Sequence, residues 1–362
     1  ALVLLNPMLA WINVTPENPE VYRAAYTYCG IIFAGIGAQL FYNFICSFLR
    51  SMGDSVTPLL FLLGSTVLNV ALDLLFILVL RWGVAGAAGA TVTAQLISPV
   101  ACFAYAFSKY PDLRLHKEDW RITGLDLKRH IVQGVPLGLQ FSVLAIGIIV
   151  MQSVVSVMTA GMNGILIAFS QTAVNVLGVY FKLQTFVFMP VFGLNQGALP
   201  VMGYNYGARN RRRLMGAYRI TLTAAVVIMA LGLVLFQLLS EQMLMLFVDR
   251  TDAAAAQEMI EVGVPALKTI SLSFLGAAFG IINSTLFQAT ARGMNSLIVS
   301  VCRQLVVILP AAWILGQQFG LNAVWYAFPI AEVASFFISY ILLWREYRTE
   351  LRFLGTEKEK KA

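Results

Sequence analysis

Two polar residues stand four positions apart inside one of the most apolar stretches of the chain. The stretch STVLNVALDLLFILVL, residues 65–80, carries Asn69 and Asp73 among leucine, valine and isoleucine. Residues i and i+4 of a helix project from one face about one turn apart, so a helix here would set the amide beside the carboxylate. The oxygens of both groups suit a hard cation such as Na⁺, and the carboxylate alone could carry a proton. We therefore predict a cation or proton site at Asn69 and Asp73.

The next apolar stretch could complete this site, because Thr91 or Thr93 would bring a hydroxyl oxygen. Counted from Val56 at about 1.5 Å per residue, Asp73 would lie roughly 25 Å from the start of its helix. As a metal site, Asp73 and Asn69 would suit Na⁺ only. The alternative is that both side chains merely form hydrogen bonds to neighbouring helices.

Few other ionisable residues lie inside apolar stretches, namely Lys182, Lys268, Arg303 and Glu332. A charge at the centre of a membrane helix costs about 2.5–3.5 kcal/mol, so each one implies a partner or a function. We expect Glu332 either to form a buried ion pair with Lys182 or to act on substrate, by recognising a cation or relaying a proton. Gln184 is a further candidate for substrate contact. Arg303 is near enough to a helix end for its side chain to reach the membrane surface.

The composition indicates that these residues belong to membrane helices. Of the 362 residues 59% are hydrophobic and 12% charged, and the mean hydropathy is +0.77. Soluble domains carry roughly twice that share of charge. A membrane helix needs about 20 mostly apolar residues. The sequence predicts an all-α polytopic membrane protein with helices at 1–12, 21–50, 56–80, 84–108, 130–158, 163–203, 212–239, 258–290, 295–316 and 321–344, the first one partial.

The basic residues indicate which side of the membrane each turn occupies. With alternating helix directions, most of the 25 lysines and arginines share one side with the C-terminus, and the other side keeps only Arg23, Arg81 and Arg250. By the positive-inside rule the rich side is cytoplasmic. The run RNRRR (209–213) is therefore interpreted as a topology anchor, and we expect no nucleic acid partner.

Internal similarity divides the chain into two lobes in the same orientation. Residues 82–99 align with 319–336, and 51–55 with 291–296, at an offset of about 240 residues. We predict a partial first lobe at 1–108, a cytoplasmic linker at 109–129, a second lobe at 130–346 and a cytoplasmic tail at 347–362. Two complete lobes would need about 450–480 residues at that offset, so we expect helices of the first lobe to precede residue 1.

Five segments together resemble a known transporter family. They are FLRSMGDSVTP, LNVALDLLFI, GVAGAAGATVTAQ, YFKLQTFVFMPVFGLNQGALPVMGYNYGARNRRR and RQLVVILPAAWIL. The chain resembles the bacterial branch of the multidrug and toxic compound extrusion (MATE) family along essentially its whole length. That resemblance implies two six-helix lobes related by pseudo-twofold symmetry, which open alternately inward and outward. It would make this chain the end of helix 3 through helix 12, or about ten of twelve helices.

The resemblance also implies a coupling site. Many prokaryotic members hold a cation or proton in the first lobe, with an Asp on helix 1, an Asn and an Asp one turn apart on helix 5, and a Thr on helix 6. Asn69, Asp73 and Thr91 match the last three, and the helix 1 Asp would precede residue 1. Another subgroup uses carboxylates on helices 7 and 10, but here helix 7 has no acid and helix 10 offers no carboxylate beyond Glu261 at its outer entry, so that version is disfavoured.

The function that we expect is antiport. The resemblance implies export of amphipathic cationic drugs in exchange for Na⁺ or H⁺, in a bacterial cytoplasmic membrane with the C-terminus inside. We expect a monomer whose partners are cationic amphiphiles and membrane lipids, with no cofactor beyond the coupling ion. A lipid-linked saccharide flippase of the same superfamily is the alternative, because Lys182, Lys268 and Arg303 could make a cavity basic. A membrane-embedded enzyme is a weaker alternative, because the sequence holds no HExxH, GxSxG or paired-carboxylate motif.

Overall fold

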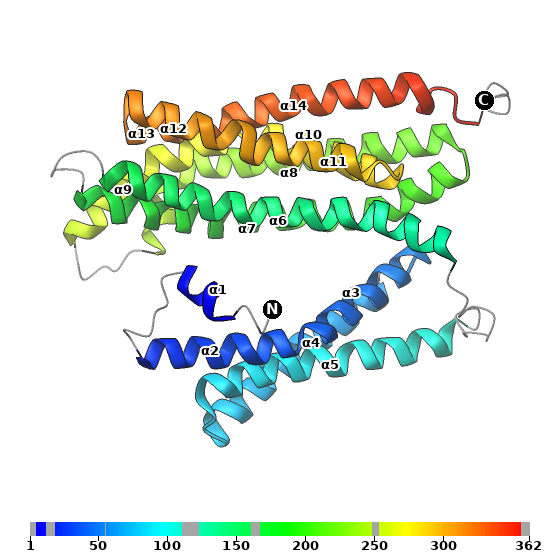
Figure 1. Ribbon diagram of the computed structural model, residues 1–362, viewed down its shortest axis with the longest axis horizontal. Coiled ribbons are helices and arrows are strands. Elements are labelled where there is room, and N and C mark those ends of the chain that lie inside the picture. The colour runs from blue at the N-terminus through cyan, green and yellow to red at the C-terminus, as the bar shows by residue number, and fades with distance from the viewer. Residues whose placement is uncertain are drawn as a thin grey trace. The chain divides into compact units, whose positions relative to one another are not determined.

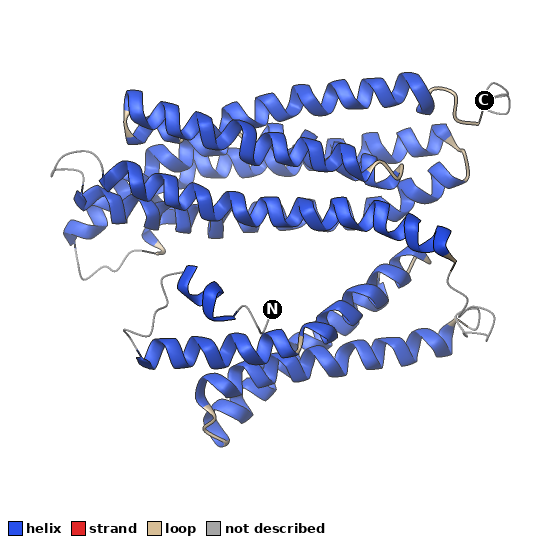
Figure 2. Ribbon diagram, in the orientation of Figure 1, coloured by secondary structure: helices blue, strands red, loops and turns tan. Residues whose placement is uncertain are grey.

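The computed structural model describes residues 5–11, 19–54, 56–110, 123–160, 167–247 and 253–355 (Figure 1). Every secondary structure element within these ranges is helical, which confirms the predicted all-α class (Figure 2). Most of the predicted linker at 109–129 lies outside the described residues. The chain divides into two compact units, Ala1–Arg121 and Ile122–Ala362.

The first unit is built from five α-helices and one π-helical segment. These are α1 (Leu5–Trp11), α2 (Pro19–Ala34), α3 (Ile36–Ser51), α4 (Val56–Asp73), the π-helical η2 (Leu74–Val79) and α5 (Gly83–Lys109).

The second unit holds the remaining helices, drawn from green to red in Figure 1. They are α6 (Gly124–Ala160), α7 (Ile167–Gly207), α8 (Arg211–Met245), α9 (Ala253–Ser271), α10 (Phe274–Ala289), α11 (Gly293–Val301), the π-helical η5 (Cys302–Val307), α12 (Ile308–Phe319), α13 (Leu321–Val324), α14 (Ala327–Glu346) and the π-helical η6 (Tyr347–Leu351).

The predicted membrane spans agree with these helices in number and place. In the described part of the chain, seven helices are long and apolar enough to cross a membrane, and two bent helix pairs raise the number to nine. The bent pairs are α2 with α3, at 43°, and α9 with α10, at 46°, where the sequence predicted unbroken helices. Conversely, α7 continues through Pro190 and Pro200, which had suggested an interruption.

The bend between α2 and α3 lies at Gly35, where the chain passes close to α5. A Cβ atom at this position would lie 2.5 Å from a methyl carbon of Val92. The missing side chain therefore allows the bent helix pair to approach α5 more closely than any other residue would allow. Nearby, Ile45, Leu49, Cys102 and Ala106 form the buried apolar cluster of this unit.

The turn between α3 and α4 is organised by Asp54. Gly53 adopts a left-handed φ of 84° there, which glycine accepts without strain. The Asp54 carboxylate accepts hydrogen bonds from the Thr57 backbone amide at 3.0 Å and the Thr57 hydroxyl at 2.7 Å. It also accepts from Lys109 Nζ at 2.9 Å and the Tyr110 hydroxyl at 3.0 Å. One side chain thus caps the start of α4 and ties it to the end of α5.

The second unit has a continuous apolar core. Aromatic rings occupy its centre, where Phe274 meets Phe236 and Phe188 edge-on at centroid distances of 5.1 Å and 5.4 Å. Tyr180 lies fully buried beside them. Leu351 and Leu354, beyond the last predicted span, are buried in the same core, so the first part of the predicted tail packs onto this unit.

Candidate functional site

The predicted site lies on a polar ladder between α4 and α5. Three contacts cross this antiparallel pair at intervals of three to four residues. The Ser98 hydroxyl donates to the Phe61 carbonyl at 3.0 Å, and the Ser65 hydroxyl donates to the Ala94 carbonyl at 3.4 Å. The third contact joins two predicted site residues, because Asn69 Nδ2 donates to Thr91 Oγ1 at 3.4 Å. All three therefore lie on the facing sides of the two helices.

Asp73 occupies the next turn of α4 but has no matching partner. Continuing the ladder sets it opposite Ala87 and Ala88, whose side chains offer no hydrogen-bond donor. Its Oδ1 atom is buried and makes no hydrogen bond in the described part of the chain. A buried carboxylate oxygen without a partner is unfavourable, so this atom is available to a ligand.

The three side chains can offer oxygen ligands from about one turn of α4 and the facing side of α5. Thr91 Oγ1 donates to the Ala87 carbonyl at 3.0 Å and accepts from Asn69, so the hydroxyl orientation is fixed. Because Asn69 uses its amide nitrogen in this contact, its carbonyl oxygen remains as an acceptor. The described residues contain no cluster of three or more His, Cys, Asp or Glu side chains. Asp73 is thus the single charged group that this cluster contributes.

The charged interior of the second unit differs from the prediction. Glu332 pairs with Arg303, whose Nη1 donates to Glu332 Oε1 at 3.1 Å, and not with Lys182. The side chains are only 20% and 13% exposed, for Arg303 and Glu332, so Arg303 does not extend to the membrane surface either. The expected Lys182–Glu332 pair is therefore wrong, because Arg303 on the neighbouring segment η5 forms the ion pair with the Glu332 carboxylate.

Lys182 and Gln184, the other predicted residues of this group, do not contact Glu332. Lys182 is exposed, with its Nζ atom 5.9 Å from the ring centre of Phe247. Gln184 is half-buried on α7, and neither residue joins the Arg303–Glu332 pair. A role for either side chain in substrate contact stays a prediction.

Glu332 is the first residue of a polar face on α14. The sequence predicted Glu332 as a candidate site residue but not Glu346. Ser335, Ser339 and Glu346 follow it at intervals of three, four and seven residues, which places all four on one face of the helix. This face runs parallel to α10. Ser339 Oγ accepts a hydrogen bond from Asn283 Nδ2 at 3.0 Å, and Glu346 accepts one from the Thr290 hydroxyl at 2.6 Å.

Glu346 was missed because the predicted span ended at residue 344. The helical spacing from Glu332 was the signal that could have found it. At the same end of the unit, Arg292 donates to Glu350 Oε2 at 2.6 Å, and the Tyr206 hydroxyl donates to Glu350. These contacts hold the start of the predicted tail against α7 and the turn after α10.

Comparison with known proteins identifies the family. The family model described as MatE matches residues 1–75 and 147–314, which is more than half of the chain. The chain belongs to the MatE family of transporters. It is thus a multi-pass membrane transporter rather than an enzyme, and the nine apolar spans of the described residues are its membrane helices.

Relatives of this MatE-family chain carry names that refer to drug resistance. The Bacillus subtilis (strain 168) protein named "Probable multidrug resistance protein YpnP" is 28% identical over 361 residues, covering 98% of this chain and 75% of that protein. Staphylococcus haemolyticus (strain JCSC1435) "Multidrug export protein MepA" is 23% identical, covering 92% of this chain and 69% of its own length.

Solved MATE structures share the fold of the MatE-family chain. A MATE transporter in complex with MaL6 superposes with a TM-score of 0.83 at 24% identity, over 97% of this chain and 75% of that one. An outward-facing multidrug resistance MATE transporter gives a TM-score of 0.83 at 24% identity, over 98% and 76%. Both confirm the predicted MATE fold.

Proposed function

We propose that this protein is a secondary active antiporter that exports amphipathic cationic drugs in exchange for Na⁺ or H⁺. The coupling cation would bind at Asp73, with Asn69 and Thr91 as neutral oxygen ligands. The observation that carries the proposal is the buried Asp73 Oδ1 without a partner, one turn from the fixed Asn69–Thr91 contact. The drug resistance names of the relatives support the choice of substrate.

The chemistry of Asp73 provides a reason for coupling. An ionised carboxylate at this depth favours conformations that hydrate it, because burying an unpaired charge is costly. Binding of H⁺ or Na⁺ removes that penalty and favours conformations that close the site. A ligand that binds two conformations with different affinity shifts the equilibrium between them by that difference. Asp73 could in this way link the ion gradient to alternating access.

The flippase alternative is less well supported. It would use a basic cavity to hold a pyrophosphate group, and the three predicted bases do not gather in one. Arg303 is neutralised by Glu332, and Lys182 and Lys268 are both exposed on different helices. Within the described residues these charges form no buried basic cluster.

The test is gradient-driven export from vesicles. Proteoliposomes containing the protein are loaded with a fluorescent organic cation, and efflux is followed after imposing either a Na⁺ gradient or a pH gradient. We expect one gradient to drive efflux by the wild type. The variant Asp73→Asn keeps the shape of the side chain but carries neither charge nor exchangeable carboxyl proton, so we expect loss of gradient-driven efflux of at least ten-fold.

A pair of threonine variants on α5 provides the matched control. Thr91→Val removes the hydroxyl that contacts Asn69, whereas Thr93→Val makes the same change two residues away, on a different side of the helix. We expect Thr91→Val to lower the affinity for the coupling ion and Thr93→Val to leave that affinity unchanged. Undiminished coupling in Asp73→Asn would remove this site from the mechanism, while absence of efflux under both gradients would contradict antiport itself.

A further inference from the structure

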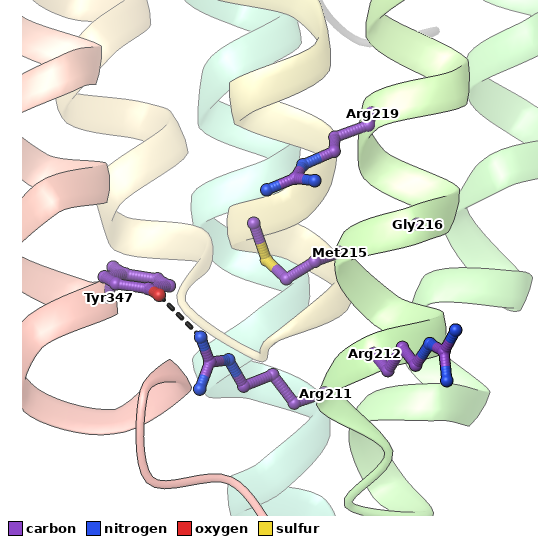
Figure 3. Close-up of a pocket in the computed structure, with 6 residues that line it drawn as sticks. All are labelled: Arg211, Arg212, Met215, Gly216, Arg219 and Tyr347. Atoms are coloured by element: carbon purple, nitrogen blue, oxygen red, sulfur yellow. Dashed lines mark hydrogen bonds between the residues drawn. The ribbon is translucent and has the colours of Figure 1, made fainter.

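Three arginines line a pocket at the start of α8 that the transport proposal does not use. Its lining residues are Arg211, Arg212, Met215, Gly216, Arg219 and Tyr347, and its volume is about 580 Å³ (Figure 3). In the described part of the chain, no acidic side chain forms an ion pair with any of the three arginines. The pocket therefore has a net positive charge that is not neutralised by its surroundings.

Hydrogen bonds fix one wall of this pocket. Arg211 Nη2 donates to the Tyr347 hydroxyl at 2.7 Å, the dashed line in Figure 3, and Nη1 donates to the Arg352 carbonyl at 3.1 Å. Because the Tyr347 oxygen accepts from Arg211, its own O–H remains available as a donor. Figure 3 shows Arg219 and Met215 directed toward the Tyr347 side, with Arg212 turned away at the rim.

Exposed apolar side chains follow the pocket residues along both helices. On α8 they recur every three to seven residues: Ile220, Val227, Leu231, Val234 and Leu238. On α14 the exposed side chains Val333, Phe337, Tyr340 and Trp344 precede the half-buried Tyr347 of η6. Exposed tyrosine and tryptophan near a helix end are typical of the level of the lipid headgroups. The arginines thus lie at this level, with apolar rows directed toward the hydrocarbon.

We propose that this pocket binds the phosphate of an anionic phospholipid. Arg211, Arg219 and the Tyr347 hydroxyl would donate to the phosphate oxygens, and the acyl chains would lie on the apolar rows of α8 and α14. Guanidinium groups bind phosphate through paired, charge-assisted hydrogen bonds. Basic pockets between membrane helices on the cytoplasmic side suit acidic lipid headgroups. A free anion would use the arginines but leave the apolar rows without a role, and a cationic substrate would be repelled.

Lipid binding to the purified protein tests the proposal without any transport assay. The protein in neutral detergent is titrated with dioleoyl phosphatidylglycerol, dioleoyl phosphatidylcholine or inorganic phosphate, and bound lipid is counted by native mass spectrometry. We expect phosphatidylglycerol to bind at least ten-fold more tightly than phosphatidylcholine. Each arginine near a membrane surface contributes roughly five-fold to such affinity, so Arg211→Gln/Arg219→Gln, which removes both proposed guanidinium ligands, should weaken phosphatidylglycerol binding by about 25-fold.

The control removes the same charge from the same side of the unit. Lys128 and Arg129 are exposed near the start of α6, and Lys128→Gln/Arg129→Gln should bind phosphatidylglycerol as the wild type does. Arg219→Gln alone, which changes one exposed side chain, should show the intermediate loss. Equal binding by the wild type and the Arg211/Arg219 variant would overturn the proposal. So would equal affinity for the two lipids, or displacement of phosphatidylglycerol by inorganic phosphate at the same concentration.

Discussion

Asp73 and Glu332, the two acids expected inside membrane helices, differ in their cationic partners. Each has one buried carboxylate oxygen without a hydrogen-bond partner in the described residues, but Glu332 also pairs with Arg303 at 3.1 Å, whereas Asp73 forms no ion pair there. A paired charge stabilises a single arrangement, because breaking the pair leaves an uncompensated charge. An unpaired carboxylate can accept and release a ligand. The contrast supports a structural role for Glu332 and a ligand-binding role for Asp73.

The Arg303–Glu332 pair predicts strong coupling between its two residues. Glu332→Gln leaves the Arg303 guanidinium without its counter-charge, and we expect destabilisation of about 3 kcal/mol, the lower end for buried pairs because both side chains keep some exposure. Arg303→Met should cost a similar amount. The double variant should lose less stability than the sum of the losses of the two single variants. Apparent unfolding temperatures in detergent measure all three.

Lys182→Met supplies the comparison for this cycle. Lys182 makes no contact with Glu332, so its effect and that of Glu332→Gln should add to within about 0.5 kcal/mol. Coupling between positions 182 and 332 as large as that between 303 and 332 would contradict the observed pairing.

Sequence spacing predicted the site residues better than it predicted their partners. Asn69, Asp73 and Thr91 lie on two helices consecutive in the chain, joined by a short turn, so one helical period was enough to bring Asn69 to Thr91. From the sequence only Lys182 was predicted as a partner for Glu332, although Arg303 lies on the span that directly precedes that of Glu332. Helical periodicity carries no information on which of these lies nearest, and only the packing of η5 against α14 shows that Arg303 does.

Helix α14 packs closely on α10 because two glycines of α10 face it. A Cβ atom at Gly276 would lie 2.8 Å from Glu332 Cβ, and one at Gly280 would lie 3.5 Å from the Ser335 hydroxyl. Small residues four apart allow two membrane helices to approach in this way. The close approach brings the polar face of α14 within reach of Asn283 and Thr290.

Gly276 is therefore the position in this pair where a methyl group should be most harmful. Gly276→Ala forces α10 and α14 apart, and we expect a loss of about 1–3 kcal/mol. Gly178→Ala on α7 is the control, because nothing lies within 4 Å of a Cβ atom there. That substitution should be neutral or stabilise the helix by up to about 1 kcal/mol. Equal unfolding temperatures for the two variants would contradict the close packing.

The turn between α3 and α4 predicts a pH dependence. The Lys109 ammonium, together with the Thr57 amide and the hydroxyls of Thr57 and Tyr110, holds the pKa of Asp54 well below its usual range, although partial burial opposes this. A carboxyl group whose pKa is lower in the folded state contributes stability above its ordinary pKa of about 3.9. That contribution is lost as the pH falls through the lower, folded-state value.

Asp54→Asn isolates this effect, because the amide oxygen can still cap α4 but cannot pair with Lys109. We expect the wild type to unfold at a higher temperature than the variant at pH 7, and the difference to shrink as the pH falls below about 4. A difference that stays constant between pH 7 and pH 3 would show that charge on Asp54 does not contribute. Scanning calorimetry in a detergent that tolerates acid would measure it.

The helices were predictable to within a few residues, but their bends were not. Apolar length places each span, and Gly, Pro and charged residues indicate its ends. The bend at Gly35 depends on Val92 in another helix, and prolines at 190 and 200 did not end α7.

The two units have one irregularity in common that the sequence did not predict. The span that holds Asp73 and the span that holds Arg303 each contain a six-residue π-helical segment, a feature frequent at functional sites.

At the scale of the whole molecule, the distribution of charge gives each turn a side of the membrane. The basic run at residues 209–213 spans the turn between α7 and α8 and the start of α8, and the turn after α12 carries no lysine or arginine. Three spans separate these turns: α8, the bent pair α9 with α10, and α11 through α12. An odd number of crossings would place the two turns on opposite sides, and the positive-inside rule predicts that the first is cytoplasmic.

Single cysteines in these turns test the orientation of the entire chain. Ala208 and Gln318 are exposed, whereas of the four native cysteines Cys46 and Cys102 are buried and Cys29 and Cys302 are partly buried. A maleimide that cannot cross membranes should label Gln318→Cys in intact cells and Ala208→Cys only after permeabilisation, with the wild type as background. The reverse pattern would place the C-terminus outside. It would also move the arginine pocket to the outer leaflet, because Arg211 follows Ala208 by three residues and no span lies between them.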